Sequence, residues 1–318
     1  KNLEGSQWSA VSYADCICAT SKSQAIGQAM PELPEVENVR RQLESMLEIA
    51  PKALMPRYLL GAEFFRKDLR FPFSKTLRQR LASGEKLGPV LGIERRAKYL
   101  LFRFESGCLL SHLGMTGAWR EIDRNTQPGE FAKRRGKHDH VRLLFDHGQS
   151  FVFEDPRRFG YMDWVDDPNQ HKLLNHLGPE PLSAEFHADY LFQLTRGKTS
   201  SIKSFIMDGR RVVGVGNIYA SEALYRAKIR PTRRAGKLKR EEAERLVLGI
   251  REVLQAAIDS GGSSIRDFKG ADGYRGGFQD LHLVYDRAGE PCRICGTKIV
   301  SKQITGRSTF WCPNCQPQ

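Results

Sequence analysis

The chain has 318 residues, enough for two domains with separate cores, and a formal net charge of +13. A hydrophobic fraction of 40% with 27% charged residues is typical of a folded protein whose partners are polyanions. No apolar run reaches the roughly 20 residues of a membrane span, so we expect no membrane partner. Four of the seven cysteines form two CxxC pairs near the C-terminal end, which favours a metal in a reducing compartment over a disulfide framework.

Residues 1–29 are a polar leader that begins at Lys1 and contains Cys16 and Cys18. The leader has neither the basic segment and apolar core of a signal peptide nor the arginines of a transit peptide. Its two cysteines are too close together, and too isolated, for a metal site. We expect this segment to be disordered, or to lie upstream of the native start.

The sequence Met30-Pro31-Glu32 stands at the head of the first apolar helical pattern. If the chain starts at Met30 and that methionine is removed, Pro31 carries a secondary amine that can attack an electrophilic carbon and form an iminium. Glu32 is then placed to act as an acid. The alternative is a proline-rich turn whose glutamates complement a helix dipole.

Residues 30–170 predict a domain with a leading helix and an antiparallel sandwich or barrel. Val36, Val39 and Leu43 share one helix face, and Pro51 ends the helix. Short alternating or buried runs follow, separated by turn residues. The predicted strands are Tyr99–Phe104, Cys108–His112, Val141–Phe145 and Phe151–Phe153.

Polar segments at the strand ends indicate a surface that follows phosphates. They are Arg95–Lys98, Lys137–His140 and Asp155–Gly160. Each alone could be a solvated loop. Met115 and Phe159 lie in glycine-flanked loops, where they either pack on the core or insert between base pairs.

Residues 171–280 predict a helical domain. Short helices are expected near 190–195 and 202–207, and a long one ends at Gly261-Gly262. Between them, Val213-Gly214-Val215-Gly216 precedes Asn217, which can cap the next helix and leave N–H groups for a phosphate. The glycine-rich stretch from Ser263 to Phe278 is expected to be a mobile loop suited to a lid.

Residues 281–318 contain two CxxC pairs separated by 16 residues. Four thiolates close a tetrahedral site, so we expect one structural Zn²⁺, with a redox site as the alternative. The residues between the pairs predict a β-hairpin with Gly306-Arg307 at its tip. The predicted ligands are Cys292, Cys295, Cys312 and Cys315.

Taken together, these motifs resemble the formamidopyrimidine-DNA glycosylases, bacterial base-excision repair enzymes. The resemblance runs from Met30 to about Gln316. Its motifs are PELPEVE (Pro31–Glu37), RRAKYLL (Arg95–Leu101), HLGMTG (His112–Gly117), KHDHV (Lys137–Val141), DPRRFG (Asp155–Gly160), HLGPEPL (His176–Leu182), VGVGNIYASE (Val213–Glu222) and the zinc hairpin.

The resemblance implies an α+β fold: a β-sandwich domain, a helical helix–two-turn–helix domain and a zinc-finger hairpin. It also implies a cytoplasmic, nucleoid-associated monomer that excises oxidised purines from damaged double-stranded DNA and cuts the strand. Pro31 would be the nucleophile and Glu32 the acid, Lys98 would serve in β-elimination and Arg307 in δ-elimination. The implied DNA contacts are Met115, Arg157 and Phe159 at the vacated base position, and His138, Lys198, Asn217 and Tyr219 along the backbone.

Two alternatives remain open. An endonuclease VIII-like enzyme would prefer oxidised pyrimidines, although Leu33 departs from the PEGPE start of that type. A non-catalytic damaged-DNA-binding protein is the better interpretation if residues 1–29 are retained, because Pro31 within a chain has no nucleophilic nitrogen. Two further departures from the family pattern are an apparent insertion before Asp68 and a variant loop with Arg266 and Tyr274. Lesion preference is therefore left open.

Overall fold

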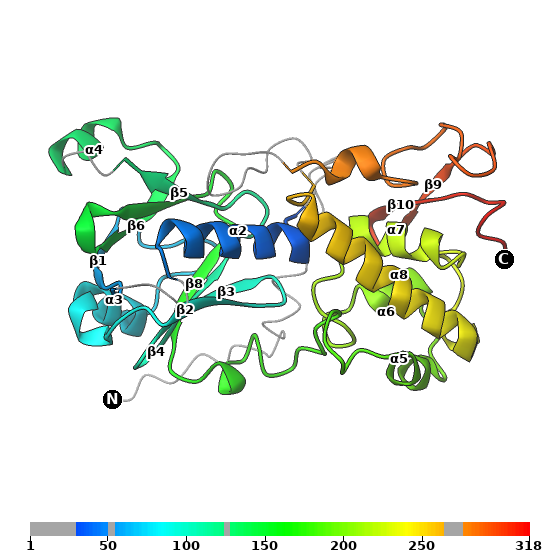
Figure 1. Cartoon of the computed structure of the whole chain (residues 1–318), viewed down its shortest axis with the longest axis horizontal. Helices are drawn as coiled ribbons and strands as arrows, with labels where there is room; N and C mark the ends of the chain where they lie inside the picture. Colours follow the sequence, from blue (N-terminus) through cyan, green and yellow to red (C-terminus); the bar gives the residue numbers. More distant parts are fainter. Residues whose placement is uncertain (1–29, 50–54, 124–127, 264–275) are drawn as a thin grey trace, which may run out of the picture.

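A computed structural model describes residues 30–49, 55–123, 128–263 and 276–318. Figure 1 shows two four-stranded sheets at one end of the molecule and helices α5 to α8 with a β-hairpin at the other, while helix α2 lies between them. The expectations for residues 1–29, Arg266 and Tyr274, and for most of the predicted lid, fall outside the described residues. No described helix is both long enough and apolar enough to cross a bilayer.

The two sheets are wholly antiparallel, with strand orders β1-β6-β7-β5 and β2-β3-β4-β8. Apolar side chains from both sheets share one core, in which Phe102 and Trp119 meet edge to face. The predicted sandwich is confirmed. The strands are β1 (Leu59–Phe64), β2 (Gly92–Arg96), β3 (Tyr99–Phe104), β4 (Gly107–His112), β5 (Ala118–Ile122), β6 (Asp139–Phe145), β7 (Ser150–Glu154) and β8 (Tyr161–Val165).

Helix α2 (Leu33–Met46) connects the two ends of the molecule. Val36, Val39 and Leu43 repeat at helical spacing and enter the sandwich core. Leu33, one turn earlier, is fully buried in the core of the helical part instead. The first turn of α2 is therefore held by the second domain, although the sequence places it in the first.

The helical part packs α5 (Ala188–Thr195) and α7 (Asn217–Arg226) against α8 (Arg240–Asp259), and α6 (Ile202–Ile206) against α7. The apolar face predicted for the long helix is buried, and two glycines of positive φ follow it. The smaller helices are α3 (Lys75–Ala82) and α4 (Pro128–Arg134), and the 3₁₀ turns are η1 (Gly84–Leu87), η2 (Asp146–Gly148), η3 (Pro168–Gln170), η4 (Ala235–Lys237) and η5 (Phe278–Leu281).

The C-terminal hairpin pairs β9 (Val300–Ile304) with β10 (Arg307–Trp311), as predicted. Thr305 and Gly306 both take positive φ, which closes the tight turn immediately before Arg307. A small core next to the hairpin includes Tyr225 of α7 and Val284 together with two of the four clustered cysteines. The hairpin therefore shares its core with the helical part.

Candidate functional site

The carboxylate of Glu32 lies buried at the N-terminus of α7, 184 or more residues further along the chain. It accepts backbone N–H groups of Gly216 at 2.8 Å, Ile218 at 3.0 Å and Tyr219 at 3.5 Å. These N–H groups have no partner within their own helix and carry the positive end of its dipole. The Glu32 side chain, next to Pro31, thus occupies the anion-binding position at the N-terminus of α7.

Two glycines make this approach possible. A Cβ at Gly216 would lie 2.1 Å from the Glu32 carboxyl carbon, and a Cβ at Gly214 would lie 2.5 Å from the Leu33 side chain. The glycines were expected to admit a phosphate, with Asn217 capping the helix. That prediction is wrong: Gly216 is the N-cap, and Glu32 occupies the N–H groups.

A second carboxylate, Glu35, lies one turn further along and is equally buried. It accepts the backbone N–H of Glu32 at 2.9 Å, that of Ser263 at 2.7 Å and the hydroxyl of Tyr219 at 2.5 Å. Tyr219 is 0% exposed. The Tyr219 side chain therefore positions Glu35 from the protein interior, and the expected contact of Tyr219 with the DNA backbone stays a prediction.

Burial sets the protonation of this pair. It raises the pKa of Glu32, the Lys98 ammonium lowers it and the nearby Glu35 carboxylate raises it, and the net pKa is about 7. Lys98 is half-buried beside the β2–β3 turn, where Ala97 has positive φ. Glu32 is thus a carboxylic acid that can still hold its proton near neutral pH, the property required of a general acid.

Sequence reasoning missed Lys203 of α6, which is 1% exposed. Its ammonium donates to Asn217 Oδ1 at 2.6 Å, to Thr309 Oγ1 at 2.9 Å and to the Ser308 carbonyl at 3.1 Å. Burial lowers its pKa to about 7, with Glu32 opposing the shift and Arg307 adding to it. The hint in the sequence was a lysine within an apolar helical run, Ile202-Lys203-Ser204-Phe205.

Lys203 also fixes two predicted site residues. Asn217 receives the lysine at its carbonyl oxygen and donates its amide to the Ser308 carbonyl at 3.0 Å. Ser308 follows Arg307 at the hairpin tip, so the half-buried Arg307 is held close to α7. The structure therefore brings the predicted residues Glu32, Asn217 and Arg307 to one locality.

The two predicted wedge loops touch each other. A Cβ at Gly114 would lie 2.4 Å from the carbonyl carbon of Phe159, so only glycine permits this contact. Asp155 joins the loops by accepting the Thr116 hydroxyl at 2.5 Å and the Gly160 N–H at 2.7 Å. Met115, Arg157 and Phe159 all remain half-buried, with the Arg157 guanidinium 4.7 Å from the Phe159 ring centre.

The cationic segments at the strand ends divide into two kinds. Arg95 pairs with Glu37 and Glu180, and Arg96 bonds Glu180 and two carbonyls, so the idea that they follow phosphates is wrong. Lys198 is exposed on the α5–α6 loop and His138 is half-buried before β6. These two remain available to a polyanion.

The four cysteine sulfurs all lie within 4.8 Å of one another. Their separations include 3.4 Å for Cys295–Cys312, 3.5 Å for Cys295–Cys315 and 3.9 Å for Cys292–Cys315. A tetrahedral zinc with Zn–S bonds of about 2.3 Å separates its sulfurs by about 3.8 Å, whereas a disulfide requires about 2.05 Å. The four sulfurs fit one structural Zn²⁺, which they would close off from substrate.

Three family models match the chain. Residues 30–162 match the N-terminal domain of formamidopyrimidine-DNA glycosylase, residues 177–269 match its H2TH domain, and residues 289–318 match a zinc finger found in FPG and IleRS. These matches support the fold class and the zinc site that the sequence predicted.

Relatives and solved structures indicate the same family as the family models do. The chain is 48% identical to the formamidopyrimidine-DNA glycosylase of Bdellovibrio bacteriovorus and 46% identical to that of Pectobacterium carotovorum, each over 90% of this chain and 100% of the relative. It is similar to the Thermus thermophilus MutM (FPG) protein, with a TM-score of 0.75 and 37% identity over 90% and 98% of the two chains. A Lactococcus lactis FPG mutant in complex with DNA containing Fapy-dG gives 0.78 and 32% over 91% and 100%. The chain belongs to the formamidopyrimidine-DNA glycosylase family.

Proposed function

We propose that the chain removes oxidised purines, 8-oxoguanine and formamidopyrimidines, from double-stranded DNA and cuts the strand, with Pro31 as nucleophile. The observation that carries this proposal is the placement of Glu32. It lies beside Pro31, buried on the α7 N–H groups, with Lys98 within electrostatic range. Relatives solved with Fapy-dG DNA and abasic-site DNA support DNA of this kind as substrate.

The first chemical steps use Pro31 and Glu32. Glu32 donates its proton to the ring oxygen of the deoxyribose, and the Pro31 nitrogen attacks C1′ as the base departs. The proton of the Pro31 nitrogen neutralises the departing base, and the ring opens with the Glu32 proton on its oxygen, which leaves an iminium between Pro31 and C1′. Since the α7 N–H groups stabilise the Glu32 carboxylate that remains, the proton donor is held in position before and after transfer.

Strand cleavage follows from the same iminium. The positive charge makes the C2′ protons acidic, so loss of one expels the 3′ phosphate, and a second elimination expels the 5′ phosphate. We assign the first elimination to Lys98 beside Glu32 and the second to Arg307 at the hairpin tip. Lys98 lies within electrostatic range of Glu32, and Arg307 lies within electrostatic range of Lys203. One site therefore accounts for both base removal and lyase activity.

The joined wedge loops would replace the base that must leave the helix before C1′ can be reached. Met115 and Phe159 supply apolar surface, and Arg157 supplies a cation at the orphaned partner base. His138, Lys198 and Asn217 would contact phosphates. We further propose that the protein acts as a monomer associated with the nucleoid through DNA. Its relatives come from bacteria, which favours the bacterial cytoplasm as its location.

The mechanism requires that the Met30–Pro31 peptide bond be cleaved, because a proline nitrogen within a chain is an amide. The family model starts to match at residue 30, directly before that proline. If residues 1–29 are retained, the same fold and surface would bind DNA without cutting it, which is the alternative function.

Borohydride trapping tests the proposal. Protein that begins at Pro31 is expected to form a covalent complex with duplex DNA containing 8-oxoguanine, whereas the same chain with Met30 retained should bind that DNA and give no trapped product. Absence of trapping by the protein that begins at Pro31, with Pro31→Gly behaving like the parent, would contradict the mechanism. Parallel assays with thymine glycol separate oxidised purines from oxidised pyrimidines as substrates.

A further inference from the structure

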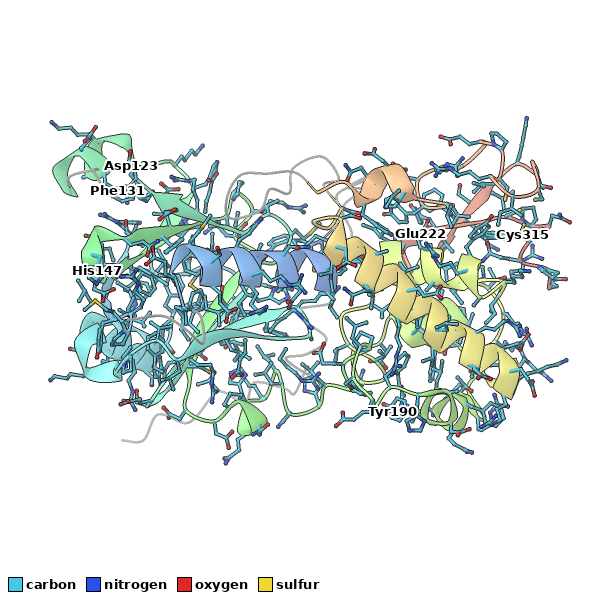
Figure 2. The ribbon with its side chains drawn as sticks, in the orientation of Figure 1. Asp123, Phe131, His147, Tyr190, Glu222 and Cys315 are labelled. Atoms are coloured by element: carbon cyan, nitrogen blue, oxygen red, sulfur yellow. The ribbon has the colours of Figure 1, made fainter. Side chains whose placement is uncertain are left out.

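The zinc cluster has a hydrogen-bond partner on a helix of another part of the molecule. Tyr225, near the C-terminus of α7, places its hydroxyl 2.9 Å from the sulfur of Cys292. Figure 2 shows Cys315 of this cluster beside the hairpin and Glu222, three residues before Tyr225, on α7. Tyr225 lies outside residues 289–318, the part of the chain that matches the zinc-finger model.

The tyrosine is built into the core of the zinc hairpin. Its side chain is 4% exposed and packs with Val284, Ile299 and Phe310 as well as with Cys292. A buried hydroxyl in apolar surroundings needs a hydrogen-bond partner, and the partner here is a sulfur. A zinc-bound cysteine is a thiolate with no proton to give, so in the metal-loaded protein the hydroxyl must donate and the sulfur accept.

A hydrogen bond to a metal-bound thiolate affects how tightly the site holds its metal. It withdraws charge from the thiolate, fixes the direction of the sulfur and disfavours its protonation as the metal leaves, and loss of such outer partners typically weakens metal binding about 10- to 100-fold. We propose that Tyr225 is an outer-sphere donor to Cys292 that retains zinc in the hairpin.

Tyr225 also links the zinc cluster to α7, the helix whose N-terminus holds Glu32. Helix α7 has 10 residues, about 15 Å at 1.5 Å per residue. Its N-terminus holds the Glu32 carboxylate, and its last turn donates to Cys292. Gln316 adds a second link, because it accepts the Cys312 N–H at 3.0 Å and donates to the Ile229 carbonyl at 2.9 Å. Zinc retention and the proton donor are therefore supported by the two ends of one helix.

The test is Tyr225→Phe in the full zinc-loaded chain, a change that keeps the ring and removes the hydroxyl. Zinc transfer to a chromogenic chelator should be about 10- to 100-fold faster than from the parent. In the cobalt-substituted protein, the sulfur-to-metal charge-transfer absorption should move to longer wavelength, because a thiolate without the hydrogen bond is easier to oxidise. A purely structural effect would not move that band.

Tyr190→Phe is the matched control. Its hydroxyl donates to the Arg211 carbonyl at 2.8 Å, and Figure 2 shows Tyr190 far from Cys315 of the zinc cluster. This control should release zinc like the parent. If Tyr225→Phe is too unstable to purify, 3-fluorotyrosine at position 225 serves instead: it is a stronger donor of nearly the same size, and it should slow release and shift the band to shorter wavelength. Unchanged zinc release, or faster release with an unchanged cobalt spectrum, would overturn the proposal.

Discussion

Two buried glutamates, one at the N-terminus of α7 and one within α7, make the same kind of contact with the backbone. Glu32 accepts N–H groups of Gly216, Ile218 and Tyr219 at the N-terminus of the helix. Glu222, a residue of the helix itself, accepts those of Leu283, Val284 and Tyr285 at 2.8 to 2.9 Å. Burial raises the pKa of both carboxyl groups. In hydrogen bonding and burial the two sites are nearly equivalent.

Their neighbours differ. Glu32 follows Pro31 and has Glu35, Lys98 and Lys203 within electrostatic range. Glu222 instead fastens the segment that leads from η5 to the zinc hairpin, with Arg226 as its charged neighbour. A raised pKa and a cradle of N–H groups therefore do not by themselves make a catalytic acid. The adjacent nucleophile and the surrounding titratable groups make Glu32 one.

The largest expected effect is that of Glu32→Gln on base removal. Glutamine has nearly the same shape and cannot donate a proton of comparable acidity, so the single-turnover rate with 8-oxoguanine DNA should fall about 10²- to 10⁴-fold. Glu222→Gln, the matched change at the second buried glutamate, should leave that rate within about threefold. Equal losses in the two variants would erase the distinction between the sites.

The pH dependence of excision and of stability also tests whether Glu32 is the acid. The pKa of Glu32 is raised to about 7 and that of an α-amino group is about 8, so excision should decline about tenfold per pH unit above about 8, where the amine is already neutral and the acid loses its proton. A carboxyl whose pKa is raised on folding contributes stability below its unfolded pKa of 4.5 and loses it as the pH rises through about 7. Thermal unfolding should therefore show Glu32→Gln gaining stability over the parent between pH 5 and 8, by on the order of 3 kcal/mol. A pH-independent difference would contradict this titration.

Glu222→Ala should affect folding rather than chemistry. The change leaves three backbone N–H groups without their acceptor and should lower the free energy of unfolding by about 3 kcal/mol. Hydrogen exchange should locate the loss in residues 283–285 and the hairpin that follows. A variant that is fully stable and yet inactive would show that Glu222 belongs to the catalytic site.

The smallest effects concern DNA contacts. Lys198→Ala should reduce the slope of log affinity against log salt by about 0.9 and weaken binding to damaged and undamaged DNA alike. Phe159→Ala should leave the slope unchanged and slow excision from duplex more than cleavage at an abasic site, where no base is extruded. If Phe159→Ala slows both reactions equally, Phe159 only packs its loop.

Local patterns predicted much of this molecule. Apolar periodicity placed α2, α8 and strands β3, β4, β6 and β7, and CxxC spacing identified the zinc ligands, because each depends on nearby residues. The contacts that define the site join distant segments: Glu32 with α7, Tyr219 with Glu35, and Lys203 with the hairpin. The glycines of 213–216 were correctly interpreted as a place of close approach. Whether a phosphate or a glutamate approaches there depends on tertiary packing, which no local pattern encodes.

The roles of the arginines at the strand ends likewise depend on tertiary packing. Arg95 and Arg96 belong to a basic segment, yet their partners Glu37 and Glu180 come from α2 and from the segment after β8. Charge along the sequence shows that cations are present. It does not show which of them the fold has already neutralised.

The assignment of Pro31 as nucleophile is tested most directly by peptide mass spectrometry of the borohydride-trapped complex. We expect the reduced sugar to be attached to the N-terminal nitrogen of a peptide beginning Pro31-Glu32-Leu33. An adduct on the Nζ atom of Lys98 or Lys203, or on a peptide that still carries Met30, would contradict the assignment of Pro31 as nucleophile.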